Sequence, residues 1–190
     1  MGKNLMSKAP FNAVPLPTDD VIPAQTLAFL QTLPPLNVYR MLTNIPSSLQ
    51  PFIELARSFL NSDEFTMRQR EIAILRVAHL THSPYESHQH TLLAKSSGMT
   101  ESEIDIIHNE QPVTSLNEEE NLICLVADEL SLEVNLTDTT FNLLFSRYST
   151  KKACELILNI SFYNMLSRFL NATRTQIEET NPLEGRSSPT

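Results

Sequence analysis

Residues 67–78 read MRQREIAILRVA, and this stretch decides the fold of the 190-residue chain. At helical spacing Met67, Ile74 and Leu75 share one apolar stripe, and Glu71 interrupts it with a charge. A carboxylate is rarely buried without a partner, because removing an unpaired charge from water costs free energy. The stretch therefore predicts a buried helix that carries one polar group with a specific partner.

His90, nineteen positions after Glu71, is the predicted partner. Helices expected over 67–80 and 84–97 are joined by a very short connection, which favours an antiparallel hairpin. At about 1.5 Å per residue, Glu71 and His90 then lie at comparable depth. Glu86 precedes His90 by one helical turn, so the three side chains can face one crevice and form a candidate acid/base unit.

Plainer interpretations of the same residues stay open at this point. Glu86 could complete a capping box with Ser83, Glu71 could pair with an arginine such as Arg76, and His90 could be a hydrogen-bonded core histidine. The two glutamates and the histidine could also ligate a divalent ion. No His-Glu-x-x-His spacing occurs in the sequence, so we predict a site without metal.

The bulk composition favours one soluble, all-α domain. The chain has only three glycines, too few for the many tight turns of an all-β protein. A net charge of −8 argues against nucleic-acid binding. No apolar run is long enough for a membrane span or a signal peptide, so we predict a cytoplasmic protein without membrane contact. Two isolated cysteines, Cys124 and Cys154, are expected to be small buried hydrophobes.

Prolines and start signals divide the chain into an expected flexible arm (1–20), a single helical domain (21–178) and a flexible tail (179–190). Capping residues and proline positions predict helices over 23–32, 36–43, 48–61, 67–80, 84–97, 101–108, 118–131, 138–147 and 150–178.

The last predicted helix is apolar on nearly every side. Ten of the fifteen residues from Leu156 to Leu170 are apolar or tyrosine. Such a helix is either central in its domain or shared with another subunit. Because a chain of this size has a limited core to surround it, we predict homo-oligomerisation.

Three segments together resemble the carboxymuconolactone decarboxylase family, which includes the alkyl hydroperoxidase D-like proteins. These are residues 70–78 (REIAILRVA), residues 85–90 (YESHQH), and Ala94 with Gly98-Met99-Thr100 and Ile104. Weaker similarity follows at residues 127–130, 155–157 and 163–165. The resemblance implies an all-α, alkyl hydroperoxidase D-like helical array, oligomeric as a dimer, trimer or hexamer. It also implies a small-molecule pocket between helices and no organic cofactor.

The resemblance also shows what is missing for peroxide chemistry. The hydroperoxidase branch of the family carries a glutamate, a Cys-x-x-Cys pair and a histidine, and these align with Glu71, Ser83, Glu86 and His90. Serine and glutamate replace the two redox thiols, so thiol peroxidase activity is disfavoured. The decarboxylase branch, whose best-known reaction removes carbon dioxide from a muconolactone by proton transfers, lacks the cysteine pair as this chain does.

We therefore predict a cofactor-independent acid/base enzyme acting on a small organic acid or lactone, with a non-catalytic oligomeric scaffold or ligand-binding protein as the alternative. His90 would shuttle the proton because the reference pKa of histidine lies near neutrality. Glu71 would orient it or act as the base. Glu86 joins them as a catalytic candidate, and an arginine near the site would offset the charge of an anionic substrate. The substrate-binding candidates are Tyr85, Ser83, Asn159 and Asn164.

Overall fold

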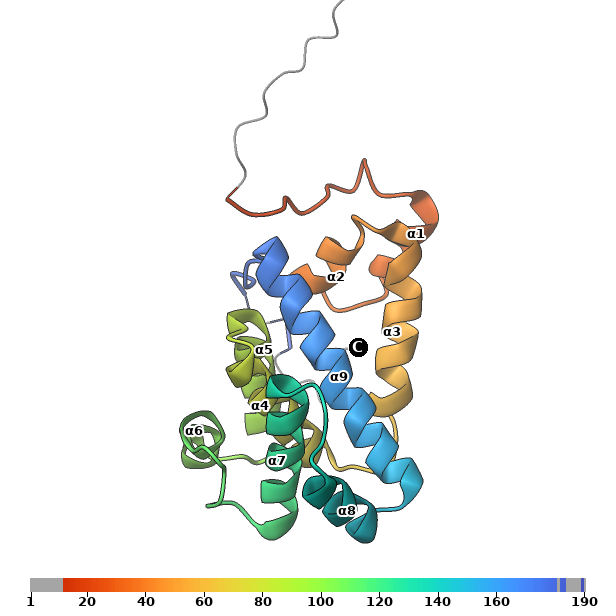
Figure 1. Ribbon diagram of the computed structural model, residues 1–190. Coiled ribbons are helices and arrows are strands. Elements are labelled where there is room, and N and C mark those ends of the chain that lie inside the picture. The colour runs from red at the N-terminus through yellow and green to blue at the C-terminus, as the bar shows by residue number, and fades with distance from the viewer. Residues whose placement is uncertain (1–11, 181, 184–188, 190) are drawn as a thin grey trace, which may run out of the picture.

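A computed structural model describes residues 12–180, 182, 183 and 189 of the chain. That part contains only helices and connections, as predicted (Figure 1). None of its helices combines the length and apolarity that a bilayer crossing requires. The nine helices of the described residues are α1 (Ala24–Leu30), α2 (Asn37–Leu42), α3 (Pro46–Leu60), α4 (Met67–Leu80), α5 (Pro84–Ser96), α6 (Glu101–Asn109), α7 (Glu118–Leu132), α8 (Asp138–Arg147) and α9 (Thr150–Thr173).

Two helices organise the array. The long α9 crosses the middle of the molecule, with α3 beside one flank and α7 and α8 packed below it (Figure 1). Helix α4 packs against α5, α6, α7 and α9. Every residue of α4 from Glu71 to Ala78 is buried, so the helix has no free face over these two turns. The segment 67–78 therefore lies at the centre of the subunit.

Helix starts follow the predicted capping signals at most positions. Thr66 accepts from the Gln69 backbone and forms a capping box that opens α4. Asn117, Thr137 and Ser149 cap α7, α8 and α9 with their side chains.

The capping box expected at Ser83 does not form. Ser83 is the N-cap residue of α5, but its side chain makes no capping hydrogen bond among the described residues. Pro84 at the first helical position needs no such bond for its nitrogen. Because Glu86 does not reach back to Ser83, its carboxylate is available for another partner.

The last helix is shorter than predicted. It ends at Thr173 rather than near Glu178, because Arg174 adopts the left-handed conformation with φ 54°. The Thr175 N–H then donates to the Leu170 carbonyl at 3.0 Å and closes the helix end. The chain turns away from the helix axis after Arg174. This turn brings Glu178 back to α2 and α5.

The face of α9 that its own subunit leaves open is narrow. Leu158 and Met165 are exposed on it. Cys154 lies on the same outer face and is exposed, so the expectation that both cysteines are buried is wrong for Cys154 and correct for Cys124. Packing within one subunit covers most of α9, and homo-oligomerisation stays a prediction.

The predicted flexible ends fall largely on residues 1–11, 181, 184–188 and 190, which lie outside the described residues. Where the ends are described, Val14 donates its N–H to the Thr173 carbonyl at 3.0 Å, and Leu183 is buried. The domain boundaries stay a prediction.

A buried arginine ties three helices together. Arg76 on α4 is fully buried and forms two hydrogen bonds with Asp128 on α7, one of them 3.0 Å from Nη2 to Oδ2. Its Nη1 also donates to the carbonyls of Ile107 at 2.6 Å and Glu110 at 2.9 Å, at the end of α6. The guanidinium is therefore satisfied on both sides, which a buried charge requires.

We expect Asp128→Ala to lower the free energy of unfolding by about 3–5 kcal/mol, because the substitution leaves the Arg76 charge buried and uncompensated. Urea unfolding measures the loss. Lys95→Ala is the matched control, since it breaks the exposed pair of Lys95 and Glu101 and should cost at most about 1 kcal/mol. Equal losses in the two variants would contradict the structural role of Arg76.

Candidate functional site

The structure brings Glu71, Glu86 and His90 together. The Nδ1 atom of His90 lies 2.7 Å from Oε2 of Glu71, within hydrogen-bond distance. On the other side of the ring, Nε2 lies 3.3 Å from Oε2 of Glu86. The three side chains are nearly inaccessible, with exposed fractions of 3% for Glu71, 2% for Glu86 and 3% for His90. An imidazole thus sits between two buried carboxylates.

The contacts on the two sides of the ring differ in kind. The Glu71 contact is a hydrogen bond. The Glu86 contact is close enough for an ion pair, but Oε2 of Glu86 has no hydrogen-bond partner among the described residues. Since 3.3 Å without favourable geometry is a weak hydrogen bond, we treat this contact as electrostatic attraction. The Oε2 atom of Glu86 is therefore free to accept one hydrogen bond.

The hairpin of α4 and α5 positions this triad. Glu71 comes from the first half of α4, and Glu86 and His90 occupy successive turns of α5. Tyr163 of α9 meets the His90 ring edge to face, with ring centroids 5.0 Å apart and planes at 87°. The ring is thus fixed by a carboxylate at either nitrogen and by an aromatic side chain.

The environment of His90 changes its proton affinity. Burial on its own would lower the pKa of His90, but the charge and hydrogen bond of Glu71 and the nearby charge of Glu86 outweigh burial and raise the pKa to about 10. At neutral pH the ring therefore keeps its proton. The role predicted from the reference pKa, a base that exchanges a proton near neutrality, does not fit this environment.

A small cavity of about 30 Å³ adjoins the triad, room for about one water molecule. Glu86 and His90 line it on one side. Most of the remaining wall is apolar or aromatic: Leu36, Val38, Tyr39, Phe52, Ala56, Leu60, Phe162, Tyr163, Leu166 and Pro189, with Tyr85 and Gln89 as further polar members.

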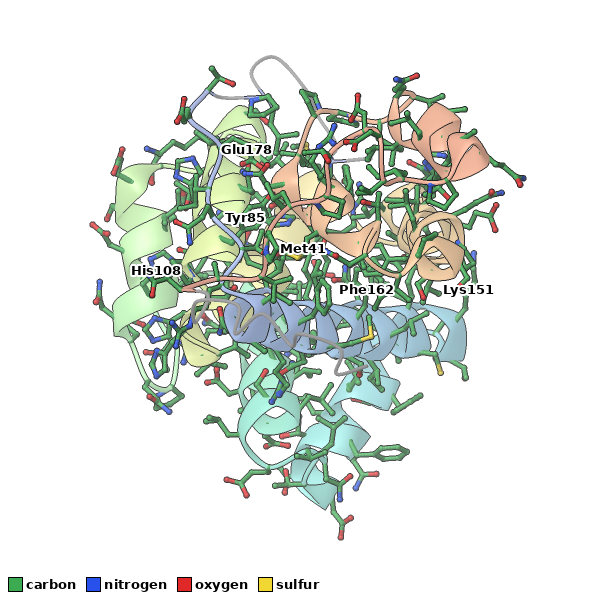
Figure 2. The ribbon with its side chains drawn as sticks, turned by 90° about the horizontal axis from the view of Figure 1, so that it is seen from above. Met41, Tyr85, His108, Lys151, Phe162 and Glu178 are labelled. Carbon is green, nitrogen blue, oxygen red and sulfur yellow. The ribbon has the colours of Figure 1, made fainter. Side chains whose placement is uncertain are left out.

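A second polar group lies next to the triad, around the carboxylate of Glu178. The Tyr85 hydroxyl donates to Oε1 of Glu178 at 2.6 Å, and the Asn37 N–H donates to the same oxygen. The Gln89 side-chain amide donates to Oε2. Figure 2 shows Tyr85 and Glu178 on the same side of the molecule, far from Lys151 at the start of α9. Sequence analysis named Tyr85 but missed Gln89 and Glu178.

The other predicted ligand-binding residues lie elsewhere. Ser83 and Asn159 are buried, but neither is among the residues that line the cavity. Each has an oxygen without a hydrogen-bond partner in the described part of the chain. Asn164 donates to Ser131 on α7 at 2.9 Å and accepts from Arg168 at 2.6 Å, so its amide is already engaged. These three candidates do not converge with Tyr85.

The predicted arginine does not reach the triad either. Arg70 donates to the backbone carbonyls of Ser62 and Phe65, and Arg76 pairs with Asp128. Arg168 turns back along α9 to Asn164. Because none of the three lines the cavity, another group must balance the charge of an anionic ligand.

A metal ion has little to bind at the triad as it stands. Each ring nitrogen of His90 faces a carboxylate oxygen, and a protonated ring offers no lone pair to a metal. Among the described residues, no group of three or more His, Cys, Asp or Glu side chains has an arrangement that could hold a metal ion.

Comparison with known proteins agrees with this architecture. Residues 47–129 match the model of the carboxymuconolactone decarboxylase family. The matched region runs from α3 into α7 and includes Glu71, Glu86 and His90, whereas α9 and Glu178 lie beyond it. No curated protein matches the chain.

Solved structures with a similar fold cover most of the chain. A peroxidase-related protein from Ralstonia eutropha JMP134, described as an alkylhydroperoxidase AhpD core, has a TM-score of 0.78 at 14% identity, with 96% of this chain and 100% of that chain covered. A peroxidase-related protein from Silicibacter sp. TM1040 has a TM-score of 0.75 at 15% identity, with coverage of 96% and 100%. A protein of unknown function from Agrobacterium tumefaciens has a TM-score of 0.64 at 16% identity, with coverage of 71% and 93%. The predicted alkyl hydroperoxidase D-like fold is confirmed.

We expect the stability of the protein to depend on the charge of His90. Because the folded-state pKa is raised to about 10 from about 6.5 in the unfolded chain, this contribution is fully present below pH 6.5 and is lost as the pH rises through 10. Urea unfolding between pH 6.5 and 10 should therefore show a decline in the free energy of unfolding that is smaller in Glu71→Gln, which lacks one of the two charges.

The exposed Glu133→Gln, at the end of α7, is the matched control and should retain the wild-type slope. Identical slopes in Glu71→Gln and wild type would contradict the assigned protonation of His90.

Proposed function

We propose that the chain is an acid/base enzyme of the carboxymuconolactone decarboxylase family that acts on a small organic acid or lactone without an organic cofactor. The observation that supports this best is the Oε2 atom of Glu86, an unpaired carboxylate oxygen buried beside a cavity and next to a charged imidazole. The pKa of the neighbouring His90 is strongly raised, and strongly perturbed ionisable groups concentrate at functional sites.

The geometry supports catalytic roles that differ from those predicted from the sequence. Glu86 lines the cavity and has a free oxygen, so it is the base that takes a proton from a carbon or oxygen of the substrate. His90 keeps its proton at neutral pH and donates it to the negative charge that develops on the substrate. Glu71 is a positioning residue, because its hydrogen bond to Nδ1 fixes the orientation and charge of the ring.

The cavity volume favours the second candidate, a non-catalytic scaffold or ligand-binding protein. A volume of about 30 Å³ holds a water molecule, whereas pockets for organic ligands typically measure about 300–1,000 Å³. The enzyme therefore requires that some of the residues covering the cavity give way to the substrate. The Glu86 carboxylate favours the enzyme, because its Oε2 atom makes no hydrogen bond among the described residues and a scaffold does not require a buried charge there.

Peroxidase activity of the thiol type has no support in this site. Ser83 and Glu86 occupy the two positions of the redox cysteines, and neither side chain can be oxidised to a sulfenate or a disulfide. Burial raises the pKa of the Cys124 thiol to about 12, which suppresses the reactive thiolate. Cys154 lies on the outer face of α9, away from the cavity lining.

Homo-oligomerisation and a cytoplasmic location complete the proposal. The exposed Leu158 and Met165 on α9 are apolar side chains that a second copy of the chain would cover. We expect light scattering at micromolar concentration to give a mass above that of the 21.5 kDa monomer. A monomeric mass would contradict the oligomer.

The acid/base role is tested with small carboxylic acids and lactones incubated with the protein in heavy water. Proton NMR then measures deuterium uptake at carbon, and carbon dioxide release is followed in parallel. For a compound that reacts, we expect Glu86→Gln to lower the rate by about 10²–10⁴-fold, because the amide cannot take the proton.

Glu133→Gln is again the matched control and should react at the wild-type rate. Wild-type rates in both Glu86→Gln and His90→Gln would refute the proposed site. Failure of every compound with the wild-type protein would favour the scaffold.

A further inference from the structure

The carboxylate of Glu178 occupies a site made by three donors from distant parts of the chain. Oε1 accepts from the Tyr85 hydroxyl at 2.6 Å and from the Asn37 N–H, and Oε2 accepts from the Gln89 amide. Both oxygens are therefore engaged, as in a bidentate ligand. The contacts join α2 and α5 to a segment that follows α9, with 141 positions between Asn37 and Glu178.

The site is rigid and largely inaccessible. Tyr85 and Gln89 have exposed fractions of 2% and 3%, and they lie one turn apart on α5. The Tyr85 hydroxyl accepts from the Val38 N–H at 3.2 Å, which leaves its own proton directed at the carboxylate. Oε1 of Gln89 has no hydrogen-bond partner among the described residues, so the amide contributes only its N–H group to these contacts.

The donors suit a carboxylate in a region that already holds two others. The triad of Glu71, His90 and Glu86 carries a net charge of −1 when His90 is protonated. Two N–H groups and a phenol stabilise an anion by charge-assisted hydrogen bonds without an arginine. They add no positive charge, but their hydrogen bonds hold the carboxylate where the predicted arginine does not reach.

The same cavity connects this site to the triad. Tyr85, Glu86, Gln89 and His90 all line it, and along α5 the two donors alternate with the two ionisable residues. A carboxylate held by Tyr85 and Gln89 is therefore next to the free oxygen of Glu86. A substrate bound there by its carboxylate would present its adjacent carbons to the acid/base pair.

We propose that Tyr85, Gln89 and the Asn37 N–H form the carboxylate subsite of this protein, and that Glu178 occupies it as an internal competitor. The ligands are small monocarboxylates that replace the Glu178 carboxylate. This inference deepens the proposed function by naming the ligand group, and its catalytic meaning rests on that function. Binding itself does not require that the triad be catalytic.

Glu178 is placed so that it can be displaced. It is partly exposed, and its neighbours Ile177 and Glu179 are exposed. The nearby segment is tethered through the Gln176 carbonyl, which accepts from the Asn37 side chain at 2.9 Å. Because an internal carboxylate has a high effective concentration, an external one binds weakly until Glu178 leaves or is removed.

The test supplies the missing side chain from solution. Glu178→Ala removes the side chain beyond Cβ, an acetate-shaped group, and sodium propionate, which is one carbon longer, is the probe. We expect propionate to raise the melting temperature of Glu178→Ala in a saturable way, because a ligand of the folded state alone stabilises it. NMR titration with ¹³C-propionate should give a dissociation constant at least about 10-fold lower for Glu178→Ala than for wild type.

Matched controls separate the subsite from general salt effects. Propionamide has the same shape without the charge and should give no saturable shift. Glu179→Ala, which changes the exposed neighbour, should bind propionate no better than wild type. Adding Tyr85→Phe to Glu178→Ala should weaken propionate binding by about 10–150-fold, as the loss of a hydrogen bond to a charged group predicts. Sodium chloride at equal ionic strength completes the set.

Equal responses to propionate and propionamide, or equal affinity of wild type and Glu178→Ala, would overturn the proposal. If Glu178→Ala does not fold, the same NMR titration of Glu178→Gln decides, since its neutral amide competes less well for the three donors. This experiment measures binding alone. If propionate does not bind, the acid/base role of Glu86 is still decided by the deuterium-exchange experiment. If Glu86 proves not to be catalytic, the carboxylate subsite is unaffected.

Discussion

The hydrogen bond between Glu71 and His90 constrains the centre of the molecule. It joins the buried helix α4 to α5 at the point where both are covered by α9, and it places a charge pair inside a largely apolar core. A charge pair at such depth holds only if its geometry is kept, because the cost of desolvation is recovered by attraction over a short distance. The depth of α4, the edge-on position of Tyr163 and the alignment of Glu86 all keep that geometry. The hairpin is therefore both the core of the fold and the frame of the candidate site.

The parts of this arrangement that depend on local patterns could be predicted. Helix α4 and its capping box follow from residues 66–80, and the pairing of Glu71 with His90 follows from helical spacing across a short connection. The role of Glu86 was open, since a capping box with Ser83 explained it equally well. In the structure the capping box between Ser83 and Glu86 is not formed, and the Glu86 carboxylate lies against His90 instead.

The parts that depend on distant segments could not be predicted. Helix α9 ends because Arg174 adopts a left-handed conformation. Bulky residues seldom adopt this conformation, and no feature of the sequence predicts it here. That single turn moves Glu178 from an expected helix end to the donors on α5 and α2. Helical spacing places Gln89 one turn after Tyr85, so the two could have been grouped from the sequence. A glutamine whose partner is unknown, however, does not indicate a binding site. The substrate is unassigned for the same reason: the walls of the cavity come from segments spread over the chain.

Stability alone does not account for these polar groups. Well-packed apolar residues of similar volume often replace a buried charge network at no cost or with a gain in stability. The free oxygens of Glu86 and Gln89 add the cost of desolvation without the return of a hydrogen bond, about 1–3 kcal/mol each. A helical scaffold needs neither of them, and its hydrophobic core is continuous around α4 and α9 without their help. A buried acceptor without a partner is explained if it binds a donor that enters the cavity, such as a water molecule or the acidic proton of a substrate. The position of Glu86, with one oxygen at the cavity and its charge shared with His90, satisfies that condition, and the Glu178 carboxylate then holds the site closed while no substrate is bound.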